Sequence, residues 1–366
     1  MKKSVFTVLI VFAVIVAFNR GHNLPRMTEI TLAEPVFVIG VDKSGHDVKL
    51  SLIYEKIESS DEGGGDVNKK YTESVVANSA SGAMERLKKR FPREMAFSTA
   101  DYFLIGEDAA RESLAAFTEF LSRNNTLRLT ASVFVVQSLA GSDFPASRAC
   151  EILSETKTLD ILRNFGENSG INAVSSRMKF YELLSKEAGE RSAYTIPALI
   201  IKEHGGGFIA VPSGYAIIKE GRLLGFMDAE AARGYNILTN KSSYSVIETK
   251  AAGLSARLES SKRRIKFNFD GDVLTDIDIN VEIRASVTDG NSPAGSSGEK
   301  EINRVIFAEL QKAVGMSKTF NCDFIGFGEA LRMRHPYRWE RLKDNWDEIY
   351  NAAPVKINTT TRTVTH

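Results

Sequence analysis

Residues 321–350 read NCDFIGFGEALRMRHPYRWERLKDNWDEIY and contain both tryptophans of this 366-residue chain. Pro336 suits the first turn of a helix, because the N–H that proline lacks would be unpaired there. Apolar residues then recur at helical spacing, and charged residues fill the positions between them. The apolar residues are Trp339, Leu342, Trp346, Ile349 and Tyr350. The pattern predicts one amphipathic helix whose aromatic stripe closes the domain core, although such a stripe could instead face a partner.

The segments around this stretch predict strands and further helices. Residues 257–287 alternate between apolar and charged side chains, which is typical of strands with one buried face. Residues 302–314 repeat apolar side chains at helical spacing, and residues 355–365 alternate again as a closing strand. Because predicted hairpins are interleaved with helices along the chain, we expect an α+β fold. The expected architecture is multidomain, with mixed or antiparallel sheets and helices packed on them.

Finer predictions concern the first two thirds of the chain. Residues 36–41 and 48–57 are predicted to form a hairpin, and residues 208–227 a second one around Glu220-Gly221. A helical stripe runs from Val76 to Phe91. Residues 127–136 are rich in residues that favour strands.

The chain is too long for one ordinary hydrophobic core, which predicts more than one domain. We expect residues 1–23 to be a signal peptide or signal anchor. Residues 24–190 are expected to form an amino-terminal α+β domain that ends in a helical connection. Residues 191–366 would form a carboxyl-terminal α+β domain, which could divide into subdomains at about 191–255 and 256–366.

The amino terminus has the layout of a secretory signal, because two lysines precede an uncharged apolar run over residues 5–18. A helix of that length reaches only about 21 Å, short of a hydrocarbon core of roughly 30 Å. Cleavage near Ala17 and retention as an anchor both remain open, and the anchor is favoured. The apolar side chains of this anchor are Val5, Leu9, Ile10, Phe12, Ile15 and Phe18.

Four segments carry a family likeness when they are taken in order: VFVIGVDKSG (36–45), RFPREMAFSTADYFLIGE and its continuation (90–136), GYAIIKEGRLLGFMD and its continuation (214–240), and residues 321–350. Together they resemble the C subunits of spore nutrient-germinant receptors, the Ger(x)C or GerAC-like family. The matching motif residues are expected to be structural. They are Gly40, Asp42, Asp323, Gly326, Gly328, Pro336, Trp339 and Trp346.

The resemblance implies a non-catalytic, membrane-associated subunit without a cofactor, which acts in nutrient-triggered spore germination by receptor assembly or signal transmission. Its implied partners are the A and B membrane subunits of the receptor, and its implied location is the extracytoplasmic face of the spore inner membrane. A net charge of +1 gives no reason to expect nucleic acid as a partner. The chain departs from the family in one respect. The cysteine that receives lipid in family members is missing, since the first cysteine here is Cys150.

Two alternatives remain, an exported hydrolase and a solute-binding protein. The run His204-Gly205-Gly206-Gly207 matches an oxyanion loop of esterases, but the chain has no G-x-S-x-G nucleophile motif. A glycine-rich turn therefore explains this run better.

Other groups of polar residues predict no metal centre. Asp276 and Asp278 suggest calcium, but the alternation of residues 257–287 places them on the solvent face of a strand. Cys150 and Cys322 fit no metal-binding spacing, and we expect two buried thiols in preference to a disulfide. The basic run 262–264 could face anionic lipid headgroups.

Overall fold

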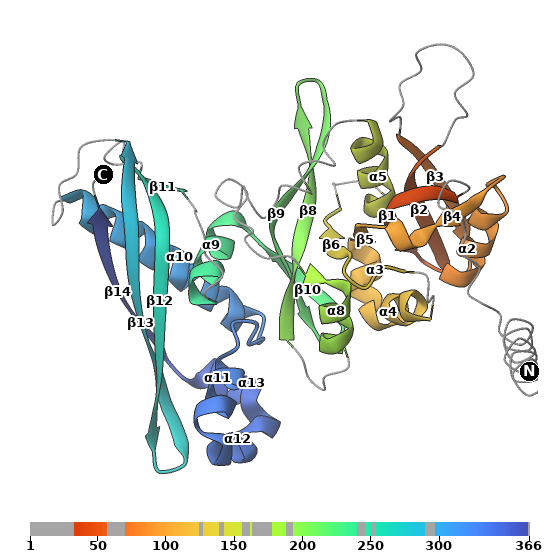
Figure 1. Cartoon of the computed structure of the whole chain (residues 1–366). Coiled ribbons are helices and arrows are strands. Elements are labelled where there is room, and N and C mark those ends of the chain that lie inside the picture. Colours follow the sequence, from red (N-terminus) through yellow and green to blue (C-terminus); the bar gives the residue numbers. More distant parts are fainter. Residues whose placement is uncertain are drawn as a thin grey trace, which may run out of the picture.

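The computed structural model has two β-sheets with helices packed on them, which confirms the predicted α+β, multidomain class (Figure 1). The predicted anchor, residues 5–18, lies outside the described residues. Within the described part of the chain, no helix is both long enough and apolar enough to cross a membrane. The structure describes residues 33–56, 70–123, 127–138, 143–155, 162, 178–187, 193–239, 246–249, 254–289 and 297–364.

The first sheet has ten strands in the order β10-β9-β8-β6-β5-β1-β2-β3, with β4 paired to β1 and β7 paired to β6. Its centre, β1-β5-β6-β8, is parallel, and antiparallel hairpins extend it on both sides. The sheet is therefore mixed. Its strands are β1 (Ala33–Ser44), β2 (Asp47–Glu55), β3 (Lys70–Ala77), β4 (Glu94–Ala96), β5 (Tyr102–Gly106), β6 (Ser132–Val136), β7 (Met178–Lys179), β8 (Ala193–His204), β9 (Gly207–Lys219) and β10 (Arg222–Met227).

Helices cover both faces of this sheet. Val38 of β1 packs in the same core as α5, whereas the neighbouring Ile39 packs with α2, α3, α4 and α8 on the opposite face. Burial on both faces explains why β1, β5 and β6 are almost continuously apolar. The elements that cross over between these strands are α2 (Ala80–Lys88), η2 (Phe97–Thr99), α3 (Glu107–Glu112), α4 (Leu114–Ser122), α5 (Pro145–Glu155) and α8 (Phe180–Glu187).

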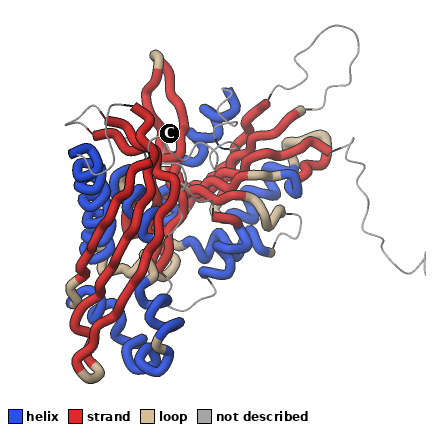
Figure 2. The backbone as a smooth tube through the Cα atoms, turned by 60° about the vertical axis from the view of Figure 1, so that its left-hand side comes forward, coloured by secondary structure: helices blue, strands red, loops and turns tan. Residues whose placement is uncertain are grey.

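The second sheet has four strands in the order β11-β12-β13-β14. β12 and β13 form a long antiparallel hairpin, and β14 runs parallel to β13. The predicted alternation is confirmed in β13, where Ile277, Ile279 and Val281 are buried in the main core. Figure 2 shows the long strands side by side. The bounds are β11 (Val246–Thr249), β12 (Leu254–Asp270), β13 (Val273–Asp289) and β14 (Val355–Val364).

Two helices join the sheets. α10 (Ser297–Thr319) packs on the second sheet, and α9 (Ala229–Leu238) packs between α10 and β9 of the first sheet (Figure 1). The contact between the helices is close at Gly234, where an added Cβ would lie 2.1 Å from the carbonyl oxygen of Glu309. An ion pair between Arg233 and Glu309 lies beside it.

The carboxyl-terminal aromatic stretch differs from the single helix that the sequence predicts. α11 (Phe327–Arg334) is followed by α12 (Pro336–Leu342), a 3₁₀ turn, η3 (Lys343–Asn345), and α13 (Trp346–Ala352). Pro336 opens α12 as expected. Because a 3₁₀ turn is wound more tightly than an α-helix, the side chains that follow η3 point in a different direction from those of a continuous helix. As a result, Trp346 is buried and Trp339 is half-buried.

Two other boundaries differ from the predictions. Val76 belongs to β3, where it is 40% exposed, and α2 begins only after Ser79, whose side chain caps it. Val76, in β3, happens to continue the helical spacing of the apolar residues in α2. The sequence therefore predicted one longer helix. The predicted strand 127–136 is shorter, since β6 begins at Ser132.

The sheets also group the chain in a way that the sequence did not anticipate. β8, β9 and β10 follow residue 190, the expected domain boundary, yet they belong to the same sheet as β1, β5 and β6. Residues 33–227 therefore supply the first sheet, and residues 246–364 supply the second.

Candidate functional site

The carboxylate of Asp323 organises the carboxyl-terminal helices. Its Oδ1 accepts the backbone N–H groups of Gly326 (3.0 Å) and Phe327 (3.0 Å). Its Oδ2 accepts the N–H of Gly328 (2.7 Å) and the indole Nε1–H of Trp346 (2.9 Å). These backbone donors lie at the start of α11, where the helix cannot satisfy them itself. One buried side chain thus caps α11 and fixes α13 against it.

The two motif glycines permit this geometry. Gly326 has a φ of +87°, a left-handed conformation that favours glycine. A Cβ on Gly328 would lie 2.7 Å from the Trp346 Nε1 and 3.0 Å from the Trp339 ring. Burial raises the pKa of Asp323, while its N–H donors act in the opposite direction.

The aromatic residues form a compact group around this carboxylate. The rings of Trp339 and Trp346 meet edge-to-face with centroids 5.5 Å apart. Trp346 also stacks on Tyr350 at 6.0 Å. The tryptophans therefore pack within the molecule, as expected from the sequence, with Trp346 in the core and Trp339 at its margin.

Asp42 is used in a similar way in the first sheet. It lies near the end of β1 and accepts the N–H groups of Ala146 (2.8 Å) and Ser147 (2.7 Å), in the first turn of α5. Burial raises the pKa of Asp42 to about 6, although its two backbone donors lower it. The motif residue Asp42, like Asp323, is therefore a buried helix cap.

Glycines again leave room for this carboxylate. A Cβ on Gly40 would lie 3.0 Å from the Sγ of Cys150, and one on Gly106 would lie 2.0 Å from the Oδ1 of Asp42. Gly106 was not among the predicted site residues. Its position between a buried strand and a helix is the signal that could have identified it.

The two cysteines are buried free thiols, as expected. Burial raises the pKa of Cys322 to about 12 and raises that of Cys150 as well. A thiol with a raised pKa is a poor nucleophile.

A cleft of about 630 Å³ lies beside the Asp323 group, between the two sheets. Its walls come from β8, α9, β12 and the helices α11 to α13. Its lining includes Tyr235, Arg263, Asp323, Met333, Trp339 and Trp346.

The side chain of Arg263 lies on a different side of β12 from the other two cations of the basic run 262–264. It is half-buried on the core side of β12, whereas Lys262 and Arg264 are exposed on the opposite side. Because side chains alternate along a strand, the three cations do not form one patch. The hypothesis that this run faces anionic lipid therefore concerns Lys262 and Arg264 alone, without Arg263.

The residues that suggested an oxyanion loop and a calcium site have structural roles. His204 to Gly207 form the exposed turn between β8 and β9, where Gly205 and Gly206 have φ values of +59° and +82°. Asp276 and Asp278 each accept a hydrogen bond of 2.8 Å from the Asn268 side chain.

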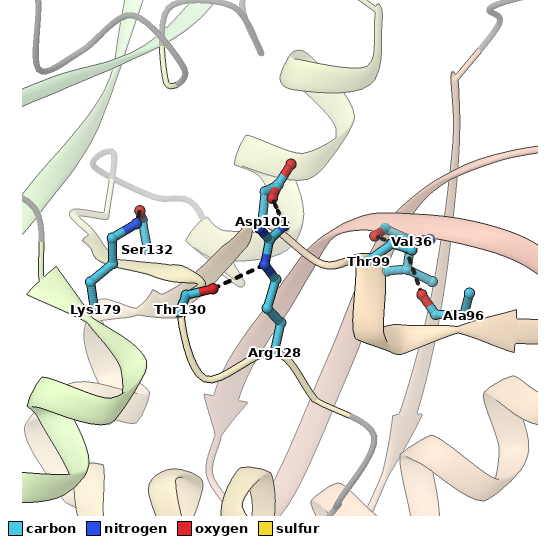
Figure 3. Close-up of polar contacts among 8 residues, drawn as sticks. All are labelled: Val36, Ala96, Thr99, Asp101, Arg128, Thr130, Ser132 and Lys179. Carbon is cyan, nitrogen blue, oxygen red and sulfur yellow. Dashed lines mark hydrogen bonds and ion pairs between the residues drawn. The ribbon is translucent and has the colours of Figure 1, made fainter. Parts of the chain in front are cut away.

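Polar contacts also join the strand beginnings of the first sheet (Figure 3). The N–H of Val36 donates to the Oγ1 of Thr99 (3.0 Å), which links β1 to η2. Arg128 donates to Thr130 (3.0 Å) and pairs with Asp101, just before β5. A further bond in the same view joins Lys179 to Ser132. These contacts link the segments that precede neighbouring strands.

Two family models match this chain in succession. One, described as "Spore germination protein N-terminal domain", matches residues 26–199. The other, described as "Spore germination B3/ GerAC like, C-terminal", matches residues 213–365.

Individual proteins show the same similarity. Spore germination protein KC of Bacillus subtilis (strain 168) is 22% identical over 385 residues, which cover 96% of this chain and 92% of that protein. Spore germination protein YndF of the same organism is 29% identical over 68 residues, 19% of this chain and 16% of that protein. The crystal structure of the GerBC protein has a TM-score of 0.58 at 16% identity, and the match covers 89% of this chain and 96% of that one. The fold is therefore shared with GerBC.

Proposed function

Because this chain belongs to the GerAC-like, or Ger(x)C, family of spore germination proteins, we propose that it acts in nutrient-triggered spore germination as the C subunit of a germinant receptor. The observation that carries the proposal is the succession of both family models over residues 26–199 and 213–365. The structural use of the motif residues supports a subunit that works through contacts. Asp42 and Asp323 both accept backbone N–H groups at the start of a helix.

The proposed role is receptor assembly or signal transmission, without catalysis. The proposed partners are the A and B membrane subunits, and the proposed location is the extracytoplasmic face of the spore inner membrane. The lysines and apolar run at the amino terminus support a membrane tether. Tethering would raise the effective concentration of the subunits for one another.

A deletion of the gene tests the role directly. Dormant spores without this chain should lose the response to the nutrients of one receptor, measured as the fall in optical density of a spore suspension. A copy of the intact gene should restore the response. A deletion strain that responds normally to every nutrient that triggers the parent strain would contradict the proposal.

The partners require a separate experiment. The full chain with an affinity tag, solubilised from spore membranes, should co-purify with the A and B membrane subunits of a receptor. Co-purification of neither subunit, with the chain intact and folded, would contradict the receptor assignment.

The exported-hydrolase alternative has its own test. His204 lies in an exposed hairpin turn, so His204→Ala should leave germination unchanged. Turnover of an ester substrate by the purified chain that disappears in this variant would favour the hydrolase.

A further inference from the structure

Arg263 lies on the side of β12 whose neighbouring side chains are apolar. It shares a side of β12 with Ile265 and Phe267, which are 6% and 7% exposed. A long cationic side chain at such a position loses hydration, and proteins normally pair it. The alternation of β12 thus shows that Arg263 differs in environment from the exposed Arg264.

One nitrogen of the Arg263 guanidinium lacks, within the described ranges of the chain, a hydrogen-bond partner that would compensate for its burial. This nitrogen is the Nη1, which is buried and has no hydrogen-bond partner among the described residues. Arg334 is a second cation nearby, and its Nη1 is engaged by the carbonyl oxygen of Ile265. Asp323 acts favourably on Arg263, but both Asp323 oxygens already accept N–H groups. A cation whose Nη1 has no hydrogen-bond partner in the described part of the chain therefore lies in the cleft wall.

The other charged groups of the cleft are engaged elsewhere. Glu329 forms two hydrogen bonds with Arg332, at 2.6 and 2.9 Å. Asp347 pairs with Lys219 at 2.7 Å. Lys186, the remaining cation of the cleft lining, has interactions of its own. The interaction missing from the described lining of the cleft is a negative group that contacts Arg263.

The size and lining of the cleft suit a small ligand. Its volume of about 630 Å³ falls within the range of roughly 300–1,000 Å³ that is typical of small-molecule sites. Tyr235, Trp339 and Met333 supply aromatic and apolar surface beside the guanidinium. Met333 is 70% exposed, so part of this surface is uncovered.

We propose that this cleft binds a carboxylate group, which pairs with the guanidinium of Arg263. A guanidinium matches a carboxylate in shape and in charge. A phosphate dianion fits less well, because it would bring two negative charges close to the buried Asp323 carboxylate. This inference goes beyond the proposed role in germination and does not depend on it.

The carboxylate could belong to a free organic acid or to the end of a peptide, and binding experiments distinguish these sources. Both tryptophans of the chain line the cleft, so their fluorescence reports its occupancy. The full chain in a non-ionic detergent would be titrated with benzoate and with benzamide, its uncharged isostere. Parallel titrations would use a pentaalanine peptide with a free or an amidated carboxyl terminus.

We expect a saturable change in fluorescence with benzoate and at least about tenfold weaker binding of benzamide, since charge-assisted hydrogen bonds are the stronger kind. A response to the free-acid peptide alone would also support the proposal and would assign the carboxylate to a peptide. Equal binding of the charged and uncharged forms of both probes, or binding of none, would overturn it.

Variants of Arg263 and Arg264 test whether carboxylate binding depends on the guanidinium of Arg263. Arg263→Gln should weaken carboxylate binding at least about tenfold, whereas Arg264→Gln, on the exposed side of the same strand, should leave it unchanged. Arg263→Met serves as a folding control, because removal of a half-buried cation with an unsatisfied nitrogen should keep or raise the melting temperature. Unchanged binding by a folded Arg263→Gln or Arg263→Met variant would refute the assignment.

Discussion

At the residue scale, Asp42 and Asp323 use the same chemistry for opposite ends of the chain. Each is a buried carboxylate that lies where a helix presents unpaired N–H groups. A negative charge at a helix amino terminus is favourable, but burial works against the ionised form. The balance between these effects decides how the stability depends on pH.

Asp42 provides a test of that balance. Its pKa is raised from 3.8 to about 6 in the folded protein, so the native state binds this proton more tightly than the unfolded chain does. The resulting stability is fully present below about pH 4 and is lost as the pH rises through 6, by up to about 3 kcal/mol. Urea denaturation at pH 4, 5, 6 and 7 would measure it. Relative to Asp42→Asn, which cannot titrate there, the parent protein should lose stability with rising pH. A constant difference between the two proteins would contradict the raised pKa.

Gly106 and Gly315 predict opposite effects of the same substitution. Gly106→Ala would place a Cβ 2.0 Å from the Asp42 carboxylate and should cost about 2–3 kcal/mol of unfolding free energy. Gly315 lies exposed within α10 with open space around it, so Gly315→Ala should add about 0.5–1 kcal/mol. Chemical denaturation of both variants compares them directly. A tolerated Gly106→Ala would mean that the Asp42 cap can shift without loss.

At the element scale, the cluster α11–α13 depends on which tryptophan reaches Asp323. Trp346 is 7% exposed and donates to that carboxylate, whereas Trp339 lies at the margin of the core. Trp346→Ala should therefore cost about 3–5 kcal/mol, and Trp339→Ala roughly half as much. Denaturation followed by circular dichroism would measure both without using tryptophan fluorescence. A cost below about 1 kcal/mol for Trp346→Ala, together with lost receptor assembly, would indicate that this cluster is an interface with a partner.

The same cluster indicates what the sequence could predict. Alternation in β13 and helical spacing in α10 are local patterns, and both elements were predicted correctly. The residues at which η3 interrupts the predicted helix, Lys343–Asn345, are polar and gave no local sign of a break. The contact made at this break is distant in sequence, because Trp346, directly after η3, donates to Asp323.

The candidate site shows the same limit of local patterns. The motif residues were identified from the sequence, but the pairing of Asp42 with the start of α5 joins residues 104 and 105 positions apart. No local spacing predicts such a contact. Arg263 is different. The alternation of β12 predicts from the sequence that it lies on the same side of the strand as Ile265 and Phe267.

At the scale of the whole molecule, the two sheets share one apolar core. Val38 of the first sheet and Ile277 of the second belong to the same buried cluster, and α9 and α10 lie between the sheets. Gly234 lets these helices approach, and ion pairs between Arg233 and Glu309 and between Lys312 and Asp228 surround the contact. We therefore expect the two sheets to unfold together.

Two spectroscopic probes can test this cooperativity, because both tryptophans lie in the part of the chain that forms the second sheet and its helices. Urea unfolding followed by tryptophan fluorescence should coincide with unfolding followed by far-ultraviolet circular dichroism, which reports on the whole chain. Gly234→Leu would force α9 away from α10, since even a Cβ at this position would lie 2.1 Å from a carbonyl oxygen. In this variant the two transitions should separate. Glu230→Gln, which removes only an exposed ion pair with Lys312, should leave them coincident. Separate transitions in the parent protein would mean that the sheets are independent units, and a change at one could then reach the other only through a partner.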